Sequence, residues 1–159
     1  MLMLWMGGLK MAKTGEKKLN WIVENPPQWD DDKRRILESA PKGAFAVPQL
    51  STGQNVPGEW WRVEDDAGVA GYGWMDCTWG DAEVLLAVDP TRQRSGVGEF
   101  ILDHLEKEAA SRGLHYLHNV VQPSHPERER VAAWLMKHGF ARDHDKDLLK
   151  RPVRHGQTS

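Results

Sequence analysis

The pattern of apolar and polar residues divides the 159-residue chain into short strand-like and helix-like segments. Alternating or β-branched runs predict strands at residues 19–24, 59–64, 69–77, 84–88 and 114–121, and a last strand from Phe140 that includes Leu148 and Leu149. Helices are predicted at residues 29–39, after a glycine loop up to Gly113, and at 127–138 before Gly139. Turns are expected at 65–68 and 78–81, and a long loop at 41–58. Antiparallel strands followed by strand–helix units predict one mixed α/β domain.

The most informative segment runs from Glu83 to Gly113. Its apolar strand stops at Asp89-Pro90 and is followed by a loop with the sequence Gln93-Arg94-Ser95-Gly96-Val97-Gly98 and by an amphipathic helix. Free N–H groups at a helix start, together with the helix dipole, favour an anion, and glycines let it approach the backbone. Arg92 and Arg94 can add charge-assisted contacts. The segment therefore predicts a diphosphate site.

The loop matches neither G-x-x-x-x-G-K-[ST] nor G-x-G-x-x-G, the two common phosphate-binding motifs. It reads Q-x-x-G-x-G over residues 93–98, directly after a strand that ends in V-D-P, and a later helix ends in AAWLMKHGF. This combination resembles the acetyl-CoA signature of the GNAT superfamily of N-acetyltransferases, over roughly residues 60 to 150. The domain would then span residues 19–152, between a flexible extension at 1–18 and a frayed tail at 153–159.

The resemblance implies an antiparallel meander followed by βα units, with two central strands splayed apart. It also implies transfer of acetyl from acetyl-CoA to a primary amine of a small molecule or protein by direct attack. The pantetheine arm would bind the backbone of Leu86, Ala87 and Val88. The pyrophosphate would bind Gln93, Arg94, Ser95, Gly96, Val97 and Gly98.

Direct attack needs a neutral amine, so a general base is expected near the acceptor. Glu83 is the first candidate and Asp81 the second. The glutamate of some superfamily members falls on Ala82, one residue away, so Glu83 faces the same side only if a β-bulge intervenes. Many members also carry a tyrosine that protonates the leaving thiolate, and its place here is Leu135. Water, Ser124 or His125 could take that role, or the thiolate leaves unaided.

Two tryptophans of the predicted meander, Trp74 and Trp79, are candidates for an aromatic wall of the acceptor site. Ordinary sheet packing is the alternative and is favoured for both. The seven histidines are scattered, and no metal site is predicted.

Composition narrows the class of protein. A net charge of −2 and a pI near 6.4 call for neither nucleic acid nor a membrane as a general partner. The single cysteine, Cys77, fits a reducing cytoplasm, and the apolar stretch at residues 1–9 is too short to cross a bilayer. A homodimer is possible through edge strands. The rival to an enzyme is a catalytically weak acyl-CoA-binding sensor or interaction module with the same fold.

Overall fold

The computed structural model describes residues 18–41, 49–93, 95–143 and 147–155. Its strands are β1 (Asn20–Glu24), β2 (Glu59–Asp65), β3 (Gly68–Thr78), β4 (Asp81–Val88), β5 (Tyr116–Val120), β6 (Ala141–Arg142) and β7 (Leu148–Pro152). Its α-helices are α1 (Asp31–Glu38), α2 (Val97–Ser111) and α3 (Arg128–Lys137). None of these helices is long and apolar enough to cross a membrane.

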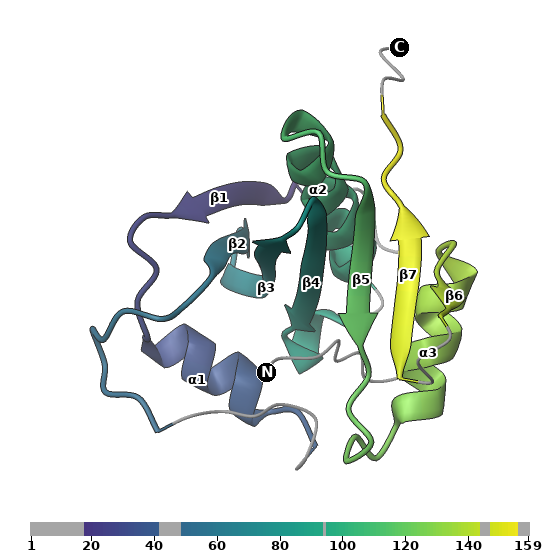
Figure 1. Cartoon of the computed structure of the whole chain (residues 1–159). Helices are drawn as coiled ribbons and strands as arrows, with labels where there is room; N and C mark the ends of the chain where they lie inside the picture. Colours follow the sequence, from purple (N-terminus) through teal and green to yellow (C-terminus); the bar gives the residue numbers. More distant parts are fainter. Residues whose placement is uncertain (1–17, 42–48, 94, 144–146, 156–159) are drawn as a thin grey trace.

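The strands form one seven-stranded mixed sheet in the order β1-β2-β3-β4-β5-β7-β6. The first four make an antiparallel meander, and α2 then crosses to β5, which lies parallel to β4. Strand β7 is antiparallel to both of its neighbours, β5 and β6 (Figure 1). The predicted mixed α/β fold, with a meander before its βα unit, is confirmed.

Two apolar cores lie on opposite faces of the sheet. The larger core joins α2 and α3 to one face, and the smaller core joins α1 to the other face (Figure 1). Along β4, Ala82, Val84, Leu86 and Val88 belong to the larger core, whereas Ala87 belongs to the smaller one. This alternation follows from the two-residue period of a strand. It determines which side chains of β4 are on the α1 face.

Helix α2 lies close to the sheet because β3 carries glycines beneath it. A Cβ at Gly71 would come within 2.7 Å of the Ala87 carbonyl oxygen. A Cβ at Gly73 would come within 2.8 Å of the ring of Trp21 and 2.9 Å of Ile101 of α2. Real Cβ atoms do not approach that closely, so a larger residue at either site would push α2 away from β3 and β4.

Helix α1 begins where the run of aspartates predicts a helix start. Asp30 is its N-cap, and its Oδ1 accepts a hydrogen bond from the backbone N–H of Lys33 at 2.8 Å. The Lys33 side chain is fully buried, with its Nζ 2.6 Å from Glu24 Oε1 and 4.9 Å from the centre of the Tyr72 ring. Burial raises the pKa of Tyr72, and the nearby carboxylates add to the effect.

The C-terminal part differs from the sequence prediction. The single last strand expected from Phe140 is two strands, β6 and β7, that pair with each other. Residues 153–155 were expected to belong to a frayed tail, but Val153 is 6% exposed and its N–H donates to the His115 carbonyl at 2.9 Å. Arg154 is held by Glu106 at 2.7 Å. The rest of the tail, 156–159, and residues 1–17 of the predicted extension lie outside the described residues.

Candidate functional site

The glycine loop connects the end of β4 to the start of α2. A short 3-10 turn at Pro90–Arg92 follows Asp89, and α2 begins at Val97. Gly96 is the N-cap of α2; it has φ 82°, in the left-handed region, and makes no side-chain cap. A Cβ at Gly96 would meet nothing within 4 Å, so the backbone angle, and not a lack of space, favours glycine. A helix start without a side-chain cap suits an anionic ligand.

The other residues of the loop differ in which hydrogen-bonding groups, side-chain or backbone, they leave available for a ligand. Gln93 has a buried Nε2 with no hydrogen-bond partner among the described residues, so it can donate to a group bound there. Ser95 Oγ already donates to a carbonyl of the 3-10 turn. Val97 and Gly98 are buried, which leaves their backbone N–H groups. Arg94 lies outside the described residues. The chemistry of the loop fits a diphosphate.

Arg92 is engaged inside the protein. Its Nε and Nη2 each lie 3.1 Å from a carboxylate oxygen of Asp65, and its Nη1 lies 2.6 Å from Asp89 Oδ2. These contacts satisfy both edges of the guanidinium. The structure therefore corrects the expectation that Arg92 contacts the diphosphate.

Strands β4 and β5 pair over only three positions. The pairs are Asp81 with Tyr116, Ala82 with Leu117, and Glu83 with His118. Beyond Glu83, a side chain of β5 replaces the backbone hydrogen bonds between the two strands: Nδ2 of Asn119 donates to the Val84 carbonyl at 2.8 Å. No further β-pairing joins the described parts of β4 and β5, so the strands are splayed from this point, as the resemblance implies.

The backbone of β4 points alternately toward β3 and toward β5. The Val84 carbonyl faces β5, because it accepts from Asn119, and the Asp89 N–H faces β3, because it donates to the Ala70 carbonyl at 2.8 Å. By this period of two, Leu86 and Val88 direct their N–H and C=O groups to the β5 side. Ala87 directs its own toward β3, and its predicted contact with pantetheine is corrected accordingly.

Glu83 lies at the last paired position before the strands separate. Between β3 and β4 the register is continuous from Gly71 opposite Val88 to Thr78 opposite Asp81, so the bulge considered from the sequence is absent in β4. Glu83 therefore faces away from the core that holds Ala82, on the face that carries α1. The family position and Glu83 are on opposite sides of the sheet.

A row of ionisable residues crosses this face at the point of separation. Asp76 of β3, Glu83 of β4, His118 of β5 and Lys150 of β7 occupy successive partner positions. Glu83 Oε1 is buried and has no hydrogen-bond partner among the described residues. Burial, and then the charge of Asp76, raises the pKa of Glu83. Burial also lowers the pKa of His118.

Asp81, the second candidate base, is already part of an ion pair. Its Oδ2 lies 3.6 Å from Nζ of Lys150, which also lies 4.3 Å from the centre of the Tyr116 ring. The same lysine acts to lower the pKa of His118, whereas Asp81 acts to raise it. Of the two predicted bases, Glu83 is thus the one with an unoccupied oxygen at the splay.

The two candidate tryptophans have different environments. Trp74 lies on β3 opposite Leu85, on the face of Glu83, and its Nε1 donates to the Pro57 carbonyl at 3.1 Å. Trp79 is 98% exposed in the β3–β4 turn with φ 53°. Trp74 can border a ligand on this face. Trp79 makes little contact with the rest of the chain and forms no wall with Trp74.

Leu135, at the place of the family tyrosine, is fully buried in the larger core. Ser124 is exposed, and His125 is buried with its Nδ1 accepting from the backbone N–H of Glu127 at 3.0 Å. No general acid is identified among the described residues. Within that part of the chain, no group of three or more His, Cys, Asp or Glu residues could hold a metal ion.

Three residues of the site were missed from the sequence: Asn119, His118 and Lys150. Asn119 had a usable signal, since it is a polar residue within an apolar strand segment, and such residues usually make a specific hydrogen bond. The other two had none, because their position beside Glu83 depends on the register of β5 and β7.

Comparisons with known proteins point to one family. A family model described as an acetyltransferase (GNAT) domain matches residues 57–142, more than half of the chain. A search of curated proteins found no match. N-acetylglutamate synthase from Neisseria gonorrhoeae, in complex with coenzyme A and N-acetyl-glutamate, superposes with a TM-score of 0.65 at 16% identity. That match covers 88% of this chain but 36% of the synthase, so the chain spans about a third of its length.

Two other solved structures are covered almost completely. A Desulfovibrio desulfuricans protein assigned to the GNAT family has a TM-score of 0.61 at 17% identity, with 86% of this chain and 100% of that chain covered. The Escherichia coli ribosomal-protein-S18-alanine N-acetyltransferase has a TM-score of 0.52 at 18% identity, with coverages of 88% and 99%. At these identities the likeness concerns the fold.

Proposed function

Because the chain belongs to the GNAT acetyltransferase family, as its glycine loop predicts, we propose that it transfers an acetyl group from acetyl-CoA to a primary amine. The acceptor is a small molecule or a protein, and its amine attacks directly. The observation that carries this proposal is the combination of a helix start without a side-chain cap, at Gly96, with a central strand that separates from its neighbour after Glu83.

The binding groups follow from the geometry of β4 and the loop. Leu86 and Val88 would hydrogen-bond the pantetheine arm through their backbone, as an added strand does. The N–H groups at the start of α2 would hold the diphosphate, together with the unpartnered Nε2 of Gln93. Acetyl-CoA is the donor that this set of groups supports.

Bound acetyl-CoA supplies a thioester carbon, to which the amine nitrogen bonds, and a thiolate, which leaves as the carbon–sulfur bond breaks. Glu83 accepts the proton that the substrate ammonium must lose before its nitrogen can attack. An alkyl ammonium with a pKa near 10.4 is neutral in about one molecule in 2,500 at pH 7, a penalty of roughly 4–5 kcal/mol. A raised pKa brings the Glu83 carboxylate closer to working pH, where a general base is most effective.

A second function is favoured by one observation. Leu135 has a hydrocarbon side chain, buried in the core, and so offers no proton to a leaving thiolate. A chain that binds acetyl-CoA but transfers it slowly would act as a sensor or interaction module. A thiolate with an ordinary thiol pKa near 8.5 leaves without an acid, and for that reason the enzyme is preferred.

The first test is thermal unfolding with acetyl-CoA, with CoA, and with NADH as the unrelated diphosphate. Acetyl-CoA at 100 times its Kd should add about 2.7 kcal/mol to the free energy of unfolding. For a chain of this length the expected rise in Tm is roughly 5–10 °C. No rise with acetyl-CoA or CoA would overturn the proposal.

The second test is a panel of amines, with CoA release followed by a thiol reagent. Release that depends on an added amine supports the transferase. Binding without release across small amines and peptide amines supports the sensor.

A further inference from the structure

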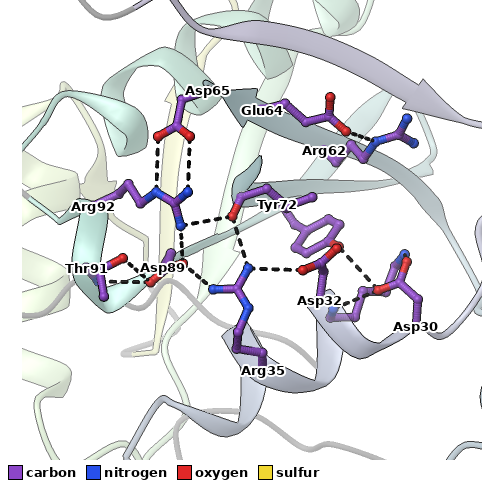
Figure 2. Close-up of polar contacts among 12 residues, drawn as sticks. Asp30, Asp32, Arg35, Arg62, Glu64, Asp65, Tyr72, Asp89, Thr91 and Arg92 are labelled. Atoms are coloured by element: carbon purple, nitrogen blue, oxygen red, sulfur yellow. Dashed lines mark hydrogen bonds and ion pairs between the residues drawn. The ribbon is translucent and has the colours of Figure 1, made fainter. Parts of the chain in front are cut away.

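Asp89, the residue that ends β4, is a buried carboxylate at the centre of a polar network. It is 2% exposed, and Figure 2 shows the groups around it. Oδ1 accepts from the backbone N–H and the hydroxyl of Thr91, each at 2.9 Å. Oδ2 accepts from Nη1 of Arg92 at 2.6 Å and from Nη1 of Arg35. Burial acts to raise the pKa of Asp89, but these hydrogen bonds outweigh it and hold the pKa below the ordinary value.

The two arginines extend the network to distant parts of the chain. Arg92 makes a two-pronged contact with Asp65, at the end of β2. Arg35 of α1 donates through Nη2 to Asp32 at 3.1 Å and to the Val69 carbonyl of β3 at 3.1 Å (Figure 2). The network of Asp89 and the two arginines thus joins four segments: α1, β2, β3 and the loop after β4.

The loop after β4 is held at this end by polar contacts, those of Asp89 and those of Arg92 with Asp65 and the Val69 carbonyl. No residue of the 3-10 turn Pro90–Arg92 is buried, so apolar packing does not fix the turn. Gln93 follows the turn directly, and Gly96 three residues later. The position of the predicted diphosphate cradle relative to β4 therefore depends on the ion pairs that Asp89 and Arg92 make. An ion pair with a buried partner can impose a defined geometry even where it contributes little net stability.

We propose that Asp89, Arg35 and Arg92 are positioning residues for the diphosphate loop, and that α1 acts on acetyl-CoA affinity through Arg35. The inference rests on the proposed function, since it requires acetyl-CoA to bind. None of the three side chains contacts the ligand. Arg92 orients the chain that leads into the cradle instead of neutralising the diphosphate.

Electrostatic attraction and positioning make opposite predictions for one substitution. Asp89→Asn removes a negative charge near the loop and leaves two cations, so attraction alone predicts tighter binding of a diphosphate. Asparagine still accepts the Thr91 N–H, which preserves the local turn. It loses the charged contacts with both arginines, so positioning predicts weaker binding. The sign of the change in Kd separates the two.

The experiment compares acetyl-CoA affinity, by calorimetric titration, in the wild type, Asp89→Asn, Arg35→Met and Arg35→Lys. We expect the first two variants to lose about tenfold in affinity, a size reached by substitutions that act through other residues. Arg35→Lys keeps the charge but not the planar fork, and should fall between Arg35→Met and the wild type. Arg34→Met is the matched control, because Arg34 of the same helix pairs with Asp31 at 3.1 Å and makes no contact with Asp89 among the described residues.

A competition titration with S-acetylpantetheine, which lacks the diphosphate, distinguishes positioning from general damage. Its affinity should be unchanged in Asp89→Asn and Arg35→Met. An equal loss for both donors, unchanged acetyl-CoA affinity, or tighter binding by Asp89→Asn would overturn the inference. If the wild type itself fails to bind acetyl-CoA, the proposed function fails instead.

Discussion

The substitution Glu83→Gln tests the proposed reaction most directly, because it removes the basic oxygen and keeps the shape of the side chain. Glu83 lies at the last paired position of β4 and β5, with one buried oxygen that has no partner among the described residues. General acid–base catalysis by a positioned side chain contributes about 10²–10⁴-fold. We expect kcat/KM for the amine to fall by an amount in that range, about 3–5 kcal/mol of the barrier.

The pH dependence gives the sign of the effect. Glu83 works as a base only when it is ionised, and burial together with Asp76 raises its pKa, so activity should fall as pH drops through that raised pKa. In Glu83→Gln this acidic limb should disappear. Asp81→Asn is the control, because Asp81 lies on the same strand as Glu83. The substitution breaks the ion pair of Asp81 with Lys150, at 3.6 Å, but should retain the acidic limb of the pH profile.

Loss of activity can be separated from loss of folding. A raised carboxyl pKa means that the ionised form is disfavoured in the folded state, so Glu83 gives stability below its unfolded pKa that is lost as pH rises through the folded pKa. Glu83→Gln should therefore unfold no earlier than the wild type at pH 8. Activity within twofold of the wild type, with the acidic limb intact, would refute the role of Glu83. If the acidic limb of the pH profile survives in Glu83→Gln but vanishes in His118→Gln, the base is His118.

Three further outcomes are expected. Gly96→Ala should cost roughly 1–2 kcal/mol of stability, because its φ is 82°, and should also weaken acetyl-CoA binding in calorimetric titrations; Gly53→Ala, at φ 88° with open space around it, should cost as much stability without affecting binding. Trp74→Ala should raise the acceptor KM, whereas Trp79→Ala should leave steady-state kinetics and Tm unchanged since that side chain is 98% exposed. Lys33→Met should lower the free energy of unfolding in urea by about 3–5 kcal/mol, because it removes the nearest cation of the buried Glu24 carboxylate and leaves only Arg62, 3.6 Å away; a loss under 1 kcal/mol would contradict this.

The parts of the molecule that the sequence predicts are those determined by neighbouring residues. The strand stop at Asp89, the glycine at the start of α2 and the cap at Asp30 each depend on local backbone chemistry, and each lies where expected. The order of β2, β3 and β4 also follows from the short turns between them. These features place the glycine loop.

The parts that the sequence does not predict depend on partners far along the chain. Arg92 has the same sequence context whether it faces a diphosphate or Asp65, and only the position of the β2–β3 hairpin decides. The insertion of β7 between β5 and β6 places Lys150 in the row with His118. No periodicity in a single segment carries that information, because strand pairing is a property of two segments.

The orientation of the β4 side chains limits the direction from which an acceptor can approach. Successive side chains of the strand alternate between the two faces, and Ala82, before Glu83, is in the core beneath α2. If Glu83 takes the proton, the amine must reach the splay from the face that carries α1 and Trp74. An acceptor from the other face would have to displace that core, which the close contact of α2 with Gly71 and Gly73 prevents. With Glu83 as the proposed base, we expect acceptor specificity to depend on α1, Trp74 and their surroundings, and substitutions on the outer side of α2 should leave the acceptor KM unchanged.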